Sequence, residues 1–316
     1  MTRAAVFAYS EVGYRCLEVL ADAGVDVAWV VTHRDDPGET RWYRSVAELA
    51  ARRGLRTSLY ETLSGIECLR TLRELAPEFL FSFYFRRMLA APLLATATRG
   101  ALNMHGSLLP HYRGRAPINW AIIHGESRTG ASLHYMIEKP DAGDLVDQEA
   151  VAIGVDDTAL DVSIKVAAAA ATVLRRSLPG LIDGSAPRFA QDLKLGSYFA
   201  GRTPADGRID FSRSAWEIHN LIRALAPPFP GAFADVAAGR LMLLGSHWCD
   251  EPAAAPGAAP RLYASNGRLY LDCADGRRLA ITRAELAGAA LNPDALSNDG
   301  APLRLDTPPL RARAHT

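Results

Sequence analysis

The feature that most constrains this chain is a regular alternation of strand-like and helix-like segments in its first half. Short apolar runs of strand length are separated by segments whose apolar residues recur at helical spacing. This order is typical of βαβ units, in which helices cover both faces of a parallel sheet. The strand-like runs are Ala4–Ala8, Val25–Val31, Phe79–Tyr84 and Ala101–His105, and the helical segments include Glu11–Ala23 and Ile66–Leu75.

The pattern changes in the last third of the chain, where short strands and tight turns replace the βαβ order. Asn266-Gly267 and Asp275-Gly276 are strong hairpin signals, and Ser214-Ala-Trp-Glu217 is a capping box that begins a helix. A length of 316 residues accommodates two domains. We therefore predict an α/β fold with a Rossmann-like, mostly parallel sheet, followed by a small C-terminal β-barrel that is OB-like. The predicted limits are 1–190 for the first domain, 191–206 for a linker, 207–300 for the barrel and 301–316 for a frayed tail.

Charge and hydropathy exclude several classes of function. Lys plus Arg and Asp plus Glu number 35 each, whereas a general nucleic-acid binder normally carries a basic excess. No stretch approaches the ~18 apolar residues of a membrane span, and the first apolar run is too short for a secretory signal. The four cysteines are scattered without a C-x-x-C pair, which argues against a zinc knuckle. We expect a soluble, cytoplasmic protein without a metal, a nucleic-acid partner or a membrane span.

The turn after the first strand lacks the glycines of a dinucleotide site. A Rossmann fingerprint places G-x-G-x-x-G at this turn, but the chain offers only Gly13 there. A P-loop is also missing from the sequence. Binding of NAD, FAD or ATP through these motifs is therefore not expected.

Two polar residues stand at the end of a strand that should be buried. Asn103 and His105 are two positions apart, so their side chains share one face of the strand while Met104 points to the other. An amide and an imidazole in such a place are costly unless they are used or paired. Taken alone, the pair fits either a catalytic site or a hydrogen-bonded structural pair.

Charged residues follow this strand in two turns. Arg113 and Arg115 flank Gly114 just before a helix that begins near Pro117, which indicates either an anion-binding surface or a solvated basic loop. Asp141 lies in a Pro-Asp-Ala-Gly turn, where an aspartate is commonly an ordinary turn residue.

The combination of these motifs resembles the folate-dependent formyltransferases. The shared pattern is N-x-H-x-S-L-L-P from Asn103, then R-G-x-x-P from Arg113, then D-x-G-D from Asp141, about 36 residues after His105. The resemblance extends to Phe229-Pro-Gly-Ala-Phe233 and covers about residues 1–300. It implies that Asn103, His105 and Asp141 are the catalytic residues.

One branch of the family is most similar, the UDP-4-amino-4-deoxy-L-arabinose formyltransferases. The similar segments are Thr32–Glu39, Ser45-Val-Ala47, Phe81–Arg86 and Tyr112–Asn119. The methionyl-tRNA formyltransferases differ at Phe83–Leu89 and Tyr112–Arg115, and they carry a basic insertion that is not found after Val31. The best-known arabinose enzymes carry a second, NAD-dependent decarboxylase domain, for which a chain ending at Thr316 has no room.

The resemblance implies formyl transfer from 10-formyltetrahydrofolate to the 4-amino group of a UDP-amino sugar, in lipid A modification and polymyxin resistance. It implies no metal and no NAD. A monomer or weak dimer is expected. The alternatives are a methionyl-tRNA formyltransferase, a formyltransferase for another nucleotide-linked 4-amino sugar, and a folate-binding module without catalysis. The implied folate contacts are Arg87, Met88, Leu89, Arg115, Ile137, Glu138, Lys139, Pro140 and Asp141.

Overall fold

A computed structural model describes residues 1–35, 38, 40–253, 259–297 and 303–305. The chain divides into two compact units. The first consists of Met1–Ala121, Arg128–Ile153 and Asp161–Gly201, and the second of Ile122–Ser127, Gly154–Leu160 and Arg202–Thr316. The boundaries at 190, 206 and 300 stay predictions.

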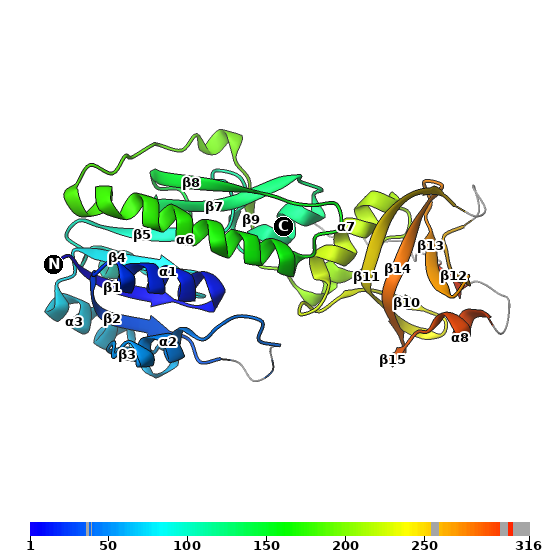
Figure 1. Ribbon diagram of the computed structural model, residues 1–316, viewed down its shortest axis with the longest axis horizontal. Helices are drawn as coiled ribbons and strands as arrows, with labels where there is room; N and C mark the ends of the chain where they lie inside the picture. The colour runs from blue at the N-terminus through cyan, green and yellow to red at the C-terminus, as the bar shows by residue number, and fades with distance from the viewer. Residues whose placement is uncertain (36–37, 39, 254–258, 298–302, 306–316) are drawn as a thin grey trace. The chain divides into compact units, whose positions relative to one another are not determined.

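The first unit is built on one seven-stranded sheet with the order β3-β2-β1-β4-β5-β7-β8 (Figure 1). The first five strands in this order pair in parallel, and β7 and β8 are antiparallel to their neighbours. The mostly parallel sheet predicted from the alternating segments is thereby confirmed. The strands are β1 (Arg3–Ala8), β2 (Asp26–Thr32), β3 (Thr57–Leu59), β4 (Phe79–Phe83), β5 (Gly100–His105), β7 (Arg128–Tyr135) and β8 (Leu145–Ala152).

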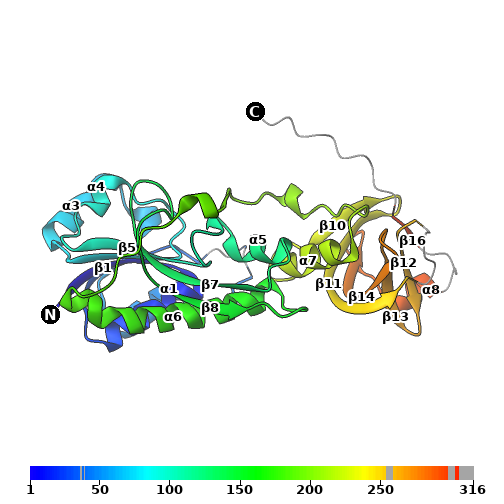
Figure 2. The same ribbon diagram turned by 90° about the horizontal axis from the view of Figure 1, so that it is seen from above.

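Helices cover both faces of this sheet. Figures 1 and 2 show α1 and α6 on one face and α3 and α4 on the other. Ser64 and Glu67 form a complete capping box at the start of α3, and the Ser45 side chain accepts a hydrogen bond from the Glu48 N–H at the start of α2. The helices are α1 (Ser10–Asp22), α2 (Val46–Arg52), α3 (Gly65–Leu75), α4 (Ala91–Leu94), α5 (Pro117–Ile123) and α6 (Ala159–Asp183), and a 3₁₀ turn covers Tyr60–Thr62.

The alternation of side chains along β5 decides which of its residues lie on the α3 face of the sheet. Ala101 belongs to the core cluster that contains Leu72 of α3 and Leu80 of β4, so it lies on the α3 face. Asn103 and His105 follow at intervals of two residues and therefore point to this same face. Met104 points to the opposite face and is buried there.

The second unit consists of α7 (Ala215–Leu225) and an antiparallel sheet with the order β10-β11-β14-β13-β12-β16. The predicted capping box from Ser214 to Glu217 is present. Both predicted hairpin turns join paired strands, with Asn266-Gly267 between β12 and β13 and Asp275-Gly276 between β13 and β14. The strands are β10 (Ala232–Val236), β11 (Gly239–Pro252), β12 (Arg261–Ser265), β13 (Arg268–Asp272), β14 (Arg277–Leu286), β15 (Ala289–Ala290) and β16 (Leu303–Arg304), with α8 at Pro293–Ser297.

The second unit is the separate antiparallel domain that the sequence predicts. Within the described residues no pairing joins β10 to β16, so closure into an OB-like barrel stays a prediction. In the tail expected to fray, Leu303–Arg304 pairs with β12 and Leu305 is buried, while 301–302 and 306–316 lie outside the described residues. In the parts of the chain that the structure describes, no helix is both long and apolar enough to span a membrane.

Candidate active site

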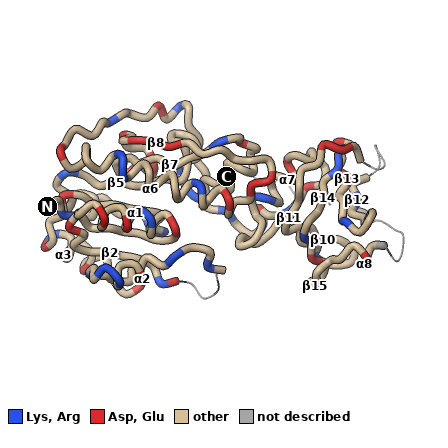
Figure 3. Tube along the Cα trace, viewed as in Figure 1, with Lys and Arg blue, Asp and Glu red and all other residues tan. Residues whose placement is uncertain are grey.

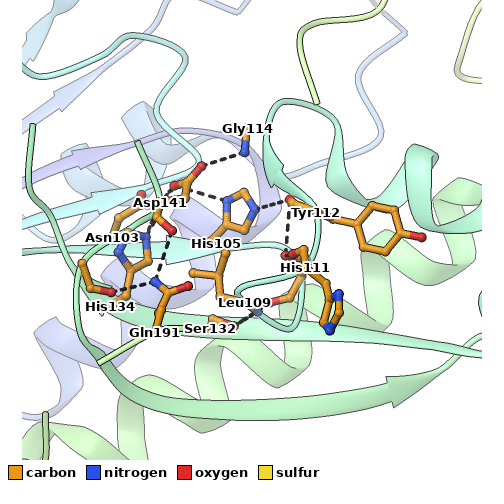
Figure 4. A network of polar contacts seen from close by, with 12 residues as sticks. Asn103, His105, Leu109, His111, Tyr112, Gly114, Ser132, His134, Asp141 and Gln191 are labelled. Carbon is orange, nitrogen blue, oxygen red and sulfur yellow. Dashed lines mark hydrogen bonds and ion pairs between the residues drawn. The ribbon is translucent and has the colours of Figure 1, made fainter. Parts of the chain in front are cut away.

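Three neighbouring elements bring the predicted catalytic residues together (Figure 4). Asn103 and His105 come from β5, and Asp141 comes from the loop between β7 and β8. His134, from β7, lies directly opposite Asn103 in the register of the two strands. The sequence motifs separated by about 36 residues thus converge on one cluster.

The Asp141 carboxylate is the centre of this cluster. Its Oδ2 accepts a hydrogen bond from the Gly114 N–H at 2.9 Å. Its Oδ1 lies 3.6 Å from His105 Nδ1 and 3.5 Å from His134 Nε2. Burial would raise the pKa of Asp141, but His105, His134 and the Gly114 N–H together hold the pKa of this carboxyl well below its usual range. Asp141 is therefore an anion throughout the neutral range.

The His105 ring is held on both sides. Its Nε2 lies 2.8 Å from the Tyr112 carbonyl oxygen. Because a carbonyl can only accept, Nε2 carries a hydrogen and donates it to Tyr112. Nδ1 faces Asp141 and is the nitrogen left to gain or lose a proton. The side chain is 7% exposed, which limits the access of water to it.

His134 orients the Asn103 amide. His134 Nδ1 lies 2.9 Å from the Tyr135 carbonyl oxygen, so Nδ1 carries a hydrogen, and Nε2 faces Asn103 and Asp141. Asn103 Nδ2 lies 3.2 Å from this Nε2 and 3.5 Å from Asp141 Oδ1. The second contact is at the limit of a hydrogen bond. The N–H that points to Asp141 is therefore the more weakly held of the two.

A short segment after α6, residues 197–199, holds residues 112–115 of the loop that contacts His105 and Asp141. We call this pairing of the two segments the clamp. Residues 113–114 form β6 (Arg113–Gly114), which pairs with β9 (Tyr198–Phe199). The Tyr112 N–H donates to the Ser197 hydroxyl at 2.8 Å. The Phe199 ring stacks on Tyr112 and on Trp120, with ring centroids 5.4 Å and 5.1 Å apart. The clamp holds both the Tyr112 carbonyl and the Gly114 N–H in place.

Gln191 supports the Asp141 turn from the same stretch of chain. Its side-chain amide donates to the backbone carbonyls of Asp141, at 3.1 Å, and of Gly143, at 2.6 Å. Gln191, like Ser197 and Phe199, falls in the segment predicted as a linker. Sequence reasoning gave no signal for these residues, because their roles depend on contacts with distant backbone groups.

The segments expected to contact folate border the hydrophobic core on the α3 face of the sheet. Leu89 is buried in the core cluster on the α3 face, and Met136, which precedes Ile137, packs against that cluster. Met88 is 68% exposed and Ile137 is 49% exposed, so neither is a core residue. Arg87, Arg115, Glu138 and Lys139 are exposed, and Pro140 is half-buried.

Two further features bear on the sequence-based expectations. Residues 36, 37 and 39 of the Thr32–Glu39 segment lie outside the described residues. Within the described ranges, no group of three or more His, Cys, Asp or Glu side chains is arranged to hold a metal ion.

Comparison with known proteins adds two family matches. Residues 6–178 match the family model described as formyl transferase, and residues 202–298 match the model of the formyl transferase C-terminal domain.

Solved structures share the fold. An N-formyltransferase from Helicobacter canadensis, crystallised with folinic acid and dTDP-3-aminofucose, has a TM-score of 0.70 and 20% identity, over 89% of this chain and 99% of that one. WlaRD, a sugar 3N-formyl transferase crystallised with dTDP and 5-N-formyl-THF, has the same TM-score and identity, over 91% and 98%. A 4-N formyltransferase from Francisella tularensis has a TM-score of 0.60 and 19% identity, over 75% and 94%.

Proposed function

The chain belongs to the formyl transferase family, and from this premise we propose that it formylates the 4-amino group of UDP-4-amino-4-deoxy-L-arabinose with 10-formyltetrahydrofolate as donor. The observation that carries the proposal is the convergence of Asn103, His105 and Asp141 on one cluster. The choice of sugar rests on the four segments that resemble the arabinose branch. The reaction then serves the modification of lipid A that gives polymyxin resistance, and it takes place in the cytoplasm.

The proposed mechanism is an acyl transfer with one tetrahedral intermediate. The sugar amine forms a bond to the formyl carbon, and the carbonyl electron pair moves to oxygen. The Asn103 N–H that Asp141 holds weakly turns to this oxyanion and stabilises it. His105 Nδ1 takes a proton from the attacking amine and returns a proton to the folate nitrogen as the bond between that nitrogen and the formyl carbon breaks. The formyl group ends on the sugar, and tetrahydrofolate leaves.

Asp141 has two parts in this mechanism. As a buried anion beside Nδ1, it stabilises the positive charge that His105 carries while it holds the amine proton. Its second oxygen fixes the Gly114 N–H, and thereby the loop whose Tyr112 carbonyl orients the imidazole. The same carboxylate therefore controls both the charge and the position of His105.

The proposed folate site is a slot beside β5. The backbone of Arg87–Leu89 and of Ile137–Pro140 supplies donors and acceptors for the pterin edge. Arg115, which directly follows β6, is a further proposed folate contact. Backbone recognition agrees with the burial of Leu89, whose side chain packs into the core and leaves its peptide groups to a ligand. Folinic acid and 5-N-formyl-THF are bound by the two solved relatives that share the fold.

The charge of the chain helps to rank the alternative substrates. Figure 3 shows cations and anions interspersed along both units, and the net charge is zero. This distribution disfavours a tRNA substrate, whose binding depends on phosphate contacts. Another nucleotide-linked amino sugar stays the stronger alternative, because the solved relatives are described with dTDP or dTDP-3-aminofucose.

The test is a direct assay of the purified chain with 10-formyltetrahydrofolate and a panel of acceptors. We expect a formylated product from UDP-4-amino-4-deoxy-L-arabinose, detected by mass spectrometry. Matched reactions contain dTDP-3-amino and dTDP-4-amino sugars and methionyl-tRNA. Faster turnover of a dTDP sugar would replace the proposed substrate, and formylation of methionyl-tRNA alone would reject the sugar class.

A further inference from the structure

Arg113 is a buried arginine without a partner. The residue is 8% exposed, and its Nε is fully buried with no hydrogen-bond partner. Throughout the described residues no carboxylate forms an ion pair with its guanidinium, and no carbonyl accepts a hydrogen bond from it. A buried N–H donor without an acceptor is costly, so the unpartnered Nε requires a reason outside ordinary packing.

Arg223 shows how this chain satisfies a buried guanidinium when the role is structural. Arg223 is 2% exposed, and its Nε donates to Asn220 Oδ1 at 2.9 Å. One terminal nitrogen donates to the backbone carbonyls of Gly154, at 3.0 Å, and Asp157, at 2.9 Å. Arg113 has nothing comparable, although the two residues are nearly equally buried. The missing partner of Arg113 is therefore a ligand rather than a protein group.

The backbone position of Arg113 connects it to the candidate site. Its neighbour Tyr112 accepts the hydrogen bond from His105, and its neighbour Gly114 donates to Asp141. The Arg113 N–H itself donates to the Ser197 carbonyl at 3.0 Å, so the clamp fixes this residue. The backbone of Arg113 is therefore fixed between the two backbone groups that contact His105 and Asp141.

We propose that Arg113 binds the diphosphate of the nucleotide-linked substrate. A planar guanidinium matches phosphate oxygens in a bidentate manner, which satisfies the donors that the protein leaves open. The inference rests on the proposed function, which supplies two anionic molecules. In the sugar nucleotide, only the sugar ring separates the diphosphate from the reacting amine. In the folate, the glutamate carboxylates lie beyond the aminobenzoyl ring, at the far end from the formyl group. The diphosphate therefore fits a residue next to His105 and Asp141.

The test measures binding without catalysis, by calorimetry with UDP, with inorganic pyrophosphate and with 5-formyltetrahydrofolate. For Arg113→Met we expect the affinity for UDP and pyrophosphate to fall about 10- to 100-fold, the range expected for loss of a charge-assisted hydrogen-bond pair. The affinity for 5-formyltetrahydrofolate should not change. The affinity of Arg113→Lys for UDP and pyrophosphate should lie between those of the wild type and of Arg113→Met, because lysine keeps the charge and loses the bidentate geometry. Arg70→Met, at an exposed position of α3, is the control for the change in net charge.

Stability gives the second readout. Because Arg113 has no partner, Arg113→Met should unfold at the same or a higher denaturant concentration than the wild type, whereas Arg223→Met should be clearly destabilised. Unchanged affinity for UDP and pyrophosphate in Arg113→Met, or no binding of either by the wild type, would overturn the assignment. If Arg113→Met loses affinity for 5-formyltetrahydrofolate alone, Arg113 binds the glutamate carboxylates of the folate and not the diphosphate. A wild type that binds UDP but formylates no acceptor would reject the proposed function and leave the Arg113 site standing.

Discussion

Several non-glycine residues around the candidate site have a strained backbone. Tyr112, Ala116 and Asp141 adopt left-handed conformations with φ of 56°, 53° and 51°, and Tyr84 at the end of β4 has a φ of 56°. Each such non-glycine residue costs on the order of 1–3 kcal/mol, so the surrounding contacts must enforce it. The contacts are present: Gly114 and Gln191 hold Asp141, and Ser197 holds Tyr112. These hydrogen bonds therefore stabilise the strained conformations of Tyr112 and Asp141.

His105 is the residue whose loss should affect chemistry and little else. In His105→Ala we expect turnover to fall ~10²–10⁴-fold, the usual cost of a positioned acid or base, with folate affinity retained. His111→Ala is the matched control, because His111 is an exposed imidazole in the same loop and should keep near-normal turnover. Steady-state kinetics and calorimetry with 5-formyltetrahydrofolate check both variants. Near-normal turnover of His105→Ala would reassign the ring to a structural pair with Asn103.

Asp141 links the site to stability at acid pH. Its pKa in the folded state lies below its ordinary value of 3.8, so the carboxylate contributes stability above that value and loses it as the pH falls toward the folded pKa. The stability of the wild type relative to Asp141→Asn should therefore be constant from pH 7 to about pH 5, and should shrink below pH 4. Urea denaturation of both proteins across this range measures the difference. A difference that stays constant down to pH 3 would show that the carboxylate is not held as an anion by its neighbours.

The clamp between β6 and β9 is the element on which the active-site geometry depends. Two backbone hydrogen bonds, from Arg113 to Ser197 and from Arg115 to Phe199, join the strands at 3.0 Å each. A Cβ atom at Gly114 would lie 2.1 Å from the Phe199 carbonyl oxygen, so only glycine permits this approach. The clamp therefore requires glycine at 114 and an aromatic ring at 199.

Phe199→Ala should reduce turnover without abolishing the fold. Removing the ring that stacks on Tyr112 and Trp120 frees the loop that holds the Tyr112 carbonyl against His105. We expect turnover to fall more than about tenfold, which corresponds to ~1.4 kcal/mol of transition-state stabilisation. Tyr198→Ala is the control, because this neighbouring side chain is 56% exposed. Equal kinetic effects of the two variants would indicate general loosening of β9 rather than a role for the stacked ring.

The elements themselves follow closely from local patterns in the sequence. Ser64 and Ser214 begin helices as their capping boxes require, and the Asn-Gly and Asp-Gly pairs make hairpin turns. The convergence of Asn103, His105 and Asp141 was available only through the resemblance to a known family. The sequence did not predict the roles of Gln191, Ser197 and Phe199. A polar, glycine-containing stretch is interpreted as a linker when its distant backbone partners are not known. His134 could have been found from the strand register that places it opposite Asn103.

At the scale of the whole molecule, stability also depends on a polar joint inside the second unit. His219 is fully buried in α7, with Nδ1 2.8 Å from the Ser246 hydroxyl and Nε2 2.9 Å from the Val155 carbonyl oxygen. Asp156 lies 3.4 Å from Nε2 and accepts a hydrogen bond from the Trp248 N–H. The joint fastens the segment Gly154–Leu160 to α7 and β11. The stability of this joint depends on whether the buried His219 imidazole is neutral or protonated.

This joint should make the protein lose stability in a pH range well above that of Asp141. Burial, reinforced by Arg223 and His247, lowers the pKa of His219 against the opposing effects of the Val155 carbonyl and Asp156. The folded state therefore favours the neutral ring, and its contribution to stability is present above the ordinary value of 6.5 and is lost as the pH falls toward the folded pKa. Relative to His219→Gln, which does not titrate, the wild type should lose stability between about pH 7 and pH 5. Denaturant titrations of both proteins at half-unit pH steps measure this difference. Parallel curves for the two proteins across that range would mean that the imidazole is not held neutral, and a loss that begins only below pH 4 would point to Asp141 instead.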